Sequence, residues 1–208
     1  MNRIYNKALN VFLPPFGGRP GGGLWMAWIA WIVGIVGIVG IVGNMQGQVY
    51  SSETGVISFR SEAPLEIISA TSKDLKGALD TTDGSFAFIV SSKSFKGFNS
   101  ELQQEHFYEN YIEADKYPSS SFKGKIIEKV DFTKEGTYEV RAKGIFEIHG
   151  VAQERIIRGT MIVGKDSIKI TSGFTVLIEE HKITVPKVVN QKIAEVIQVN
   201  IEITLLKK

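Results

Sequence analysis

From Gln48 to the end of the chain, apolar and polar residues alternate one by one in several segments. The clearest is "TYEVRAKGIFEIHG", in which one face is apolar or small and the other is mostly charged. A period of two is typical of an antiparallel strand with one buried face. "IQVNIEITL" and "SFKGKI" alternate in the same way. In the first segment we expect these residues to point inward: Tyr138, Val140, Ala142, Gly144, Phe146 and Ile148.

Eight segments of the region 48–208 are predicted to be strands, and turn signals such as "TTDG", "TKEG" and "VGKD" separate several of them. About eight short strands predict either a sandwich or a barrel. Glycines inside strands permit sharp curvature and favour the barrel: Gly124, Gly144, Gly159 and Gly173. The eight segments are "GVISFRS", "GSFAFIVSS", "SFKGKI", "TYEVRAKGIFEIHG", "ERIIRGTMIV", "SIKITSG", "GFTVLIEEHKI" and "IQVNIEITL".

One stretch, residues 99–115, has a helical period instead. Ser100 and Gln103 form a capping-box pair at its start. Pro118 is expected to end the helix. The residues that recur at near-helical spacing are Leu102, His106, Phe107, Tyr111 and Ile112.

The segment 24–43, "LWMAWIAWIVGIVGIVGIVG", has twenty residues and no charge. As a helix it would cross about 30 Å, which is the thickness of a bilayer core. Three tryptophans lie near its start, where an aromatic belt is expected, and the basic residues Arg3, Lys7 and Arg19 precede it. The positive-inside rule therefore predicts a cytoplasmic N-terminus and a body outside the cytoplasm.

Residues 24–43 have more than one interpretation. The run is longer than a typical signal core, and "NMQGQ" after it offers no small-x-small cleavage site, which favours an uncleaved anchor. A cleaved signal peptide and a buried helix of a soluble protein are the alternatives. Residues 1–23 are rich in Pro and Gly and are predicted to form a flexible arm.

Composition excludes several classes of function. The chain has no cysteine, so it forms no disulfide and no thiolate metal site. Three of the 24 basic residues and none of the 22 acidic ones lie in residues 1–47, so the body is nearly neutral. A nucleic-acid partner is not expected, because the sequence shows no clustered basic face.

The string "QQEHFYENYIEADKYPSSSFKG", residues 103–124, superficially resembles a zinc-protease motif. Such a motif needs a second histidine four residues after the first, but Asn110 follows His106 at that spacing. We therefore expect a packing or hydrogen-bonding role for His106. His149 and His181 lie far away in sequence, and no nucleophile elbow is present. These observations predict neither a metal site nor an enzyme.

The same region resembles the YceI-like family of lipid- or polyisoprenoid-binding proteins. The resemblance lies in "FKGFNSELQQEHFYENYIEADKYPSSSFKGKI", "GIFEIHGVAQERIIRGTM" and "GFTVLIEEHKITVPKVVNQKIAEVIQVNIEITL" and covers roughly residues 49–206. Ala152 stands where the family usually has a threonine after the His-Gly turn. The resemblance implies an all-β, eight-stranded, antiparallel, lipocalin-like barrel with a short helix. It also implies export, mostly to the periplasm.

The family resemblance further implies an isoprenoid lipid, polyprenyl or quinone-like, inside the barrel and no other cofactor. The protein would be anchored in the inner membrane through residues 24–43, or secreted after signal cleavage. The alternative is a non-catalytic structural module with a barrel filled by its own side chains, acting as a homodimer or as a subunit of a membrane complex. The residues expected at the interior and mouth are Phe86, Phe88, Phe107, Tyr111, Phe122, Tyr138, Val140, Ala142, Phe146, Ile148 and Phe174.

Overall fold

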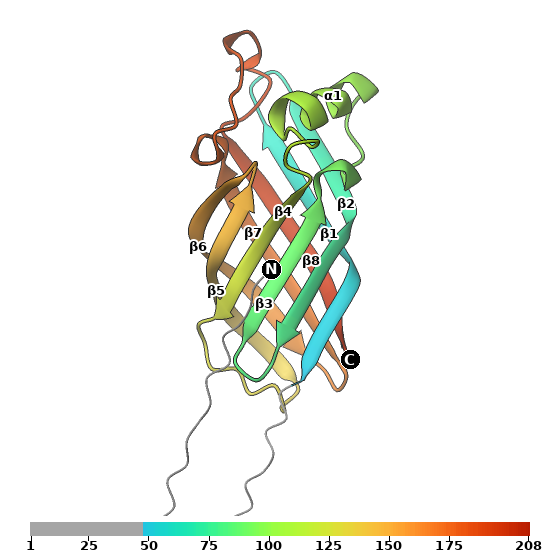
Figure 1. The fold of residues 1–208 in the computed structure, drawn as a ribbon, viewed down its shortest axis with the longest axis vertical. Coiled ribbons are helices and arrows are strands. Elements are labelled where there is room, and N and C mark those ends of the chain that lie inside the picture. Colours follow the sequence, from blue (N-terminus) through green and yellow to red (C-terminus); the bar gives the residue numbers. More distant parts are fainter. Residues whose placement is uncertain (1–47) are drawn as a thin grey trace, which may run out of the picture. The chain divides into compact units, whose positions relative to one another are not determined.

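The computed structural model describes residues 48–208; the predictions for residues 1–23 and 24–43 lie outside the described residues. Eight antiparallel strands pair in sequence order, and β8 pairs with β1 to close a barrel (Figure 1). Within 48–208, no helix is both long enough and apolar enough to span a bilayer. The strands are β1 Val49–Glu62, β2 Ile67–Asp80, β3 Ser85–Ser91, β4 Ser119–Ile126, β5 Gly136–Ile148, β6 Val151–Val163, β7 Ser167–Leu177 and β8 Val196–Lys207.

The two ends of the barrel carry different connections. At one end, the closed end, lie the turn 81–84, the loop 127–135, the turn 164–166 and the C-terminus. At the other, the mouth end, lie the β5–β6 turn and all the short helices (Figure 1). The helices are η1 Ser92–Ser94, α1 Glu101–His106, the π-helical η2 Phe107–Tyr111, η3 Ile178–His181 and η4 Lys187–Val189.

The predicted number of strands is right, but two assignments are wrong. "SIKITSG" and "GFTVLIEEHKI" are one strand, β7, which continues through Gly173 and is followed by η3. The strand β2 was missed. Its buried positions change phase between Ser72 and Leu75, where the pairing with β1 is shifted by a bulge. A bulge breaks the two-residue period, so no continuous alternation marks this strand in the sequence.

The helix is shorter than predicted. Ser100 accepts a hydrogen bond from the Gln103 backbone N–H, and the Gln103 side chain accepts one from the Asn99 N–H, which is close to the expected capping box. The helical stretch ends at Tyr111 with Ile112 as its C-cap, because Glu113 adopts a left-handed conformation with φ 47°. Pro118, the predicted terminator, lies beyond this turn.

Two of the strand glycines allow a close strand approach. Gly124 of β4 and Gly144 of β5 are directly paired. A Cβ atom on either glycine would clash with the backbone of the opposite strand at Lys143 or Lys123. The space expected at Gly144 is therefore occupied by β4, and this position supports strand packing instead of a gap.

Side chains fill the closed end. Tyr50, Val163, Ile168 and Leu205 come from β1, β6, β7 and β8, and all are at most 5% exposed. Phe132 and Tyr138 pack against this group from the loop before β5 and from β5 itself. Side chains therefore fill the barrel at this end between β1, β6, β7 and β8.

Candidate ligand cavity

A cavity of about 250 Å³ lies inside the barrel between the closed end and the helices at the mouth. One water molecule needs roughly 10–15 Å³ of such space, so the cavity has room for a ligand of many atoms. Its walls are almost entirely apolar. Every strand contributes, because the inward positions of the alternation face this space.

A row of aromatic rings crosses one wall of the cavity. Phe86 packs against Phe88 and Phe122 with ring centroids 5.6 and 4.9 Å apart. Phe122 then meets Phe146 at 5.9 Å, and Phe146 meets Phe174 at 5.7 Å, both edge to face. These rings come from β3, β4, β5 and β7, so the row forms only when the strands pair.

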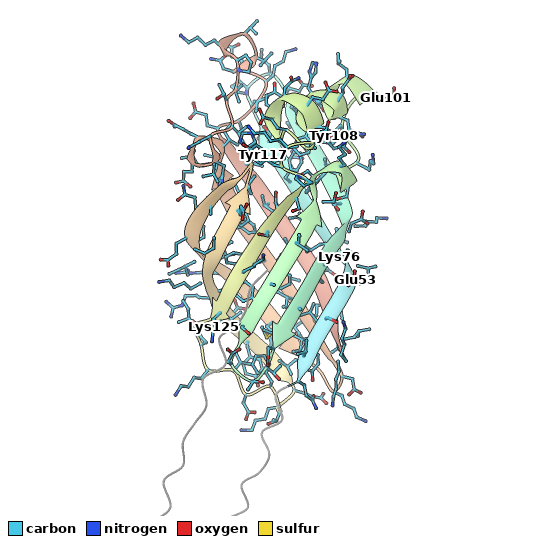
Figure 2. The ribbon with its side chains drawn as sticks, viewed as in Figure 1. Glu53, Lys76, Glu101, Tyr108, Tyr117 and Lys125 are labelled. Atoms are coloured by element: carbon cyan, nitrogen blue, oxygen red, sulfur yellow. The ribbon has the colours of Figure 1, made fainter. Side chains whose placement is uncertain are left out.

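A second aromatic group lies beneath the helices at the mouth. Phe107 stacks on Phe59 at 5.2 Å, and Phe95 and Phe98 complete the group. Tyr108 holds η2 in place, because its hydroxyl donates to the carbonyl oxygens of Phe95 and Lys93 at 2.6 and 3.0 Å. Figure 2 shows Tyr108 and Glu101 together at the helical end of the barrel.

Ten of the eleven residues expected at the interior line this cavity: Phe86, Phe88, Phe107, Tyr111, Phe122, Val140, Ala142, Phe146, Ile148 and Phe174. Tyr138 does not. It is the third residue of β5 and lies at the closed end, where its hydroxyl donates to the carbonyls of Lys134 and Asp131 in the loop 127–135 at 3.1 and 3.3 Å. Alternation identified the correct face of Tyr138 but not its depth.

Three lining aromatics were missed: Phe59, Phe95 and Phe98. Phe59 lies in "GVISFRS" at an inward position of the alternation, so the pattern was sufficient to find it. Phe95 and Phe98 lie in the irregular segment after η1, where no period exists. Only the folding of this segment over the barrel brings them to the cavity.

Polar groups on the cavity wall are few, and several are already hydrogen-bonded. The Ser92 hydroxyl donates to the Tyr117 carbonyl at 2.8 Å, and the Ser61 hydroxyl accepts from the Ala194 N–H at 2.8 Å. Burial raises the pKa of Tyr111, so its phenol is neutral at physiological pH. The wall therefore offers an apolar chain an almost wholly apolar surface.

The three histidines do not form a metal site. The packing or hydrogen-bonding role expected for His106 is wrong: the residue is exposed on α1 and has no side-chain hydrogen bond within residues 48–208. His149 Nδ1 lies 3.0 Å from the His181 carbonyl, and His181 Nδ1 lies 3.2 Å from the Val151 carbonyl. In this part of the chain, no three His, Asp or Glu side chains gather as ligands.

The His149–Gly150 turn joins β5 to β6, and both residues have positive φ, 52° and 68°. This geometry is typical of a two-residue hairpin. Tyr117 packs edge to face on His149 at 4.6 Å, and a Cβ atom on Gly150 would clash with the Tyr117 ring. The strand, His-Gly turn and strand expected from the family resemblance are therefore present.

Residues 48–205 match the model of the YceI-like domain. The chain belongs to the YceI-like family. No curated protein matches this YceI-like chain.

Two solved structures share the fold. A polyisoprenoid-binding domain from Saccharophagus degradans, implicated in plant cell wall breakdown, aligns with a TM-score of 0.66 at 11% identity, covering 78% of this chain and all of that domain. BcnA from Burkholderia cenocepacia aligns with a TM-score of 0.60 at 13% identity, covering 72% of this chain and 95% of BcnA. At these identities the likeness concerns the barrel alone.

Proposed function

We propose that this YceI-like barrel binds an amphiphilic isoprenoid lipid, such as a polyprenyl or quinone-like molecule, with its tail in the interior. The observation that supports this most directly is the apolar cavity of about 250 Å³ above a solid closed end. A barrel of eight strands is about the smallest that holds a small ligand. The polyisoprenoid-binding domain of similar fold is consistent with the same class of ligand.

The apolar wall provides enough free energy for binding without head-group chemistry. Burying about 400 Å² of hydrocarbon contributes on the order of 10 kcal/mol before the costs of ordering. The cavity includes little that is polar, so we expect selectivity for tail length and shape over head-group charge. A catalytic role is not proposed, because the walls hold no nucleophile paired with a base.

Ala142→Phe tests this function. Ala142 lines the cavity and faces Ile157 and Ile126 across the neighbouring strands. A ring at this position takes up space that the tail would occupy. The variant should keep the thermal stability of the lipid-free protein and lose lipid occupancy, measured by native mass spectrometry of protein purified from its host.

The control for that experiment is Lys143→Phe, one residue along β5 and exposed on its outer face. It adds the same ring outside the barrel, so lipid occupancy should not change. Wild-type protein that never carries lipid, together with a strongly destabilised Ala142→Phe, would instead support the alternative, a structural module with a filled interior. Overpacking a full core costs about 1–3 kcal/mol.

We also propose that the barrel lies outside the cytoplasm, tethered to the inner membrane by residues 24–43 or released after cleavage. The support is the uncharged run of twenty residues, whose flanking basic residues all precede it. Protease added to spheroplasts should digest residues 48–208. Protection until the cells are lysed would refute export.

A further inference from the structure

The barrel has a stretch in which two neighbouring strands are not joined by their backbones. β6 and β7 pair only over Thr160–Val163 and Ile168–Thr171. Nearer the mouth, residues 151–159 of β6 still pair with β5, and residues 172–177 of β7 still pair with β8. We call the line between 151–159 and 172–177 the seam. Along it, one edge of each strand has no backbone partner.

Only side chains join the two edges of the seam. The Arg155 guanidinium donates to the Thr175 carbonyl at 2.9 Å and to the Glu180 carboxylate at 3.1 Å. The Gln153 side chain donates to the Glu180 carbonyl at 3.2 Å, and the Ser172 hydroxyl donates to the Arg158 carbonyl. Within the described residues, no backbone-to-backbone hydrogen bond crosses here.

Another divergence, between β2 and β3, is closed differently. From the Lys76–Ile89 pair towards the mouth end these strands also separate, but the segment after η1 fills the space between them. Its Lys96 exchanges two backbone hydrogen bonds with Thr71, at 2.8 and 2.9 Å. Backbone pairing and a buried Phe95 therefore seal that divergence, whereas the seam has side-chain contacts only.

The inner side of the seam is the cavity wall. Ile157 and Gly159 of β6 and Ser172, Phe174 and Val176 of β7 all line the cavity. Arg155 takes an inward position in the alternation of β6, opposite Gly144, yet its charged end turns to β7 and its side chain is 26% exposed. A partly exposed ion pair contributes little to stability, so this contact can open at small cost.

On the side of the mouth covered by α1 and η2, the axial route into the cavity is obstructed. Phe59, Phe95, Phe98 and Phe107 pack together beneath the helices at the mouth. A long tail entering there would have to separate these rings and then pass along the length of the cavity. A tail entering through the seam would have to part the side-chain contacts of Arg155, Gln153 and Ser172 and then a single pair of rings, Phe146 and Phe174.

We propose that the seam is a side opening through which a flexible hydrocarbon or isoprenoid chain enters and leaves the cavity, and that the Arg155–Glu180 pair holds it closed. This inference rests on the proposed lipid-binding function. Glu180 belongs to η3, which is otherwise fastened to the β5–β6 turn by the contacts of His149 and His181. Breaking the Arg155–Glu180 pair frees one edge of the seam while η3 keeps its remaining contacts.

The test uses Arg155→Cys with Glu180→Cys. The chain has no other cysteine, so a short bis-maleimide will join only these two positions. Protein loaded with a dansyl-labelled farnesol is mixed with excess phosphatidylcholine vesicles, and release is followed by stopped-flow fluorescence. Before cross-linking, release should be about threefold faster than in wild type, the change expected when one partly exposed ion pair is lost. After cross-linking, release should be slower than in wild type.

A second Arg–Glu pair provides the matched control. Arg141 Nε lies 2.7 Å from the Glu128 carboxylate near the closed end, away from the seam. Arg141→Cys with Glu128→Cys, free or cross-linked, should release the probe at the wild-type rate. If the double variant at the seam folds poorly, the single change Glu180→Gln, at a side chain 47% exposed, should give the faster release alone.

The outcomes separate the two proposals. Wild-type protein that retains no probe refutes the lipid-binding function. Wild-type protein that retains the probe, with equal release rates for the free and cross-linked seam variants, refutes the side opening and leaves the function intact. Equal slowing by cross-links at the seam and at the closed end also refutes the side opening, because it indicates a general effect of rigidity.

Discussion

The closed end and the cavity half of the barrel use the same alternating strands but differ in what fills them. At the closed end, Ile168 and Leu205 are fully buried, and Tyr50 and Val163 pack beside them. In the cavity half, Ile201 of β8, only four residues before Leu205, borders free volume. The inward positions are apolar in both halves, so the alternation alone does not distinguish a solid interior from a hollow one.

The two halves also differ in how the strands are held. Near the closed end every neighbouring pair of strands has backbone pairing, whereas the seam near the mouth has side-chain contacts only. A continuous ladder with a filled interior resists opening, and a stretch with fewer buried contacts opens locally at lower free energy. We therefore expect stability to come mainly from the closed end and ligand exchange to involve the other half.

The largest difference between the halves should appear on truncating a buried isoleucine. Ile168→Ala at the closed end should reduce the free energy of unfolding by about 2–5 kcal/mol, because it leaves a void in a filled core. Ile201→Ala in the cavity half should cost roughly half as much, since the side chain already borders free volume. Urea unfolding measures both, and equal losses would contradict the comparison.

Gly144→Ala should reduce the free energy of unfolding by a smaller amount. This variant tests whether the cavity half is loosely packed throughout. The added methyl would meet the β4 backbone, so we expect a loss of about 1–3 kcal/mol. Gly136→Ala on the same strand is the control, because its added methyl would make only ordinary contacts, 3.5 Å or more from the Tyr138 ring. If Gly144→Ala is as stable as the wild type, the close approach of β4 and β5 is not required.

Protonation of His181, at the mouth end, should lower the free energy of unfolding in acid. The residue is fully buried, and its Nε2 atom has no hydrogen-bond partner among residues 48–208. Burial lowers the pKa of His181 below its usual value, so the folded protein binds this proton less readily than the unfolded chain. The stabilisation is present above about pH 6.5, the pKa of an unperturbed histidine, and is lost as the pH falls towards the folded pKa.

The measurement for His181 is the free energy of unfolding between pH 7.5 and pH 5 in wild type and in His181→Gln, which should show a weaker fall over this range. His106→Gln is the control, because His106 is exposed on α1 and the pH profile should match the wild type. Identical profiles for all three proteins would exclude His181 as the cause.

The smallest effect should come from the outer surface of the barrel. Glu53 and Lys76 lie together on β1 and β2 (Figure 2), and both side chains are more than half exposed. The carboxylate raises the pKa of Lys76, but solvent screens the pair. Lys76→Ala should leave the midpoint of urea unfolding unchanged within error. A clear shift would mean that the exterior contributes to the difference between the halves.

The faces of most strands, the barrel and most of the cavity wall were predictable from the sequence, but β2 was not. Inward residues such as Val140, Phe146 and Phe122 were identifiable because side chains of a strand alternate between its two faces, whatever the strand pairs with. The helix start at Ser100 was also identifiable, since capping depends on neighbours within three residues. These features depend on local geometry, which the sequence records directly.

The depth of each residue and the gaps between strands became visible only in the folded barrel. Tyr138 and Phe146 share one face of β5, but the register and the loop 127–135 place the first at the closed end and the second at the cavity. The phase change in β2, the arrival of Phe95 and Phe98 at the mouth, and the seam beside Arg155 depend on partners distant in sequence. Depth and pairing follow from contacts between strands, and no local pattern contains them.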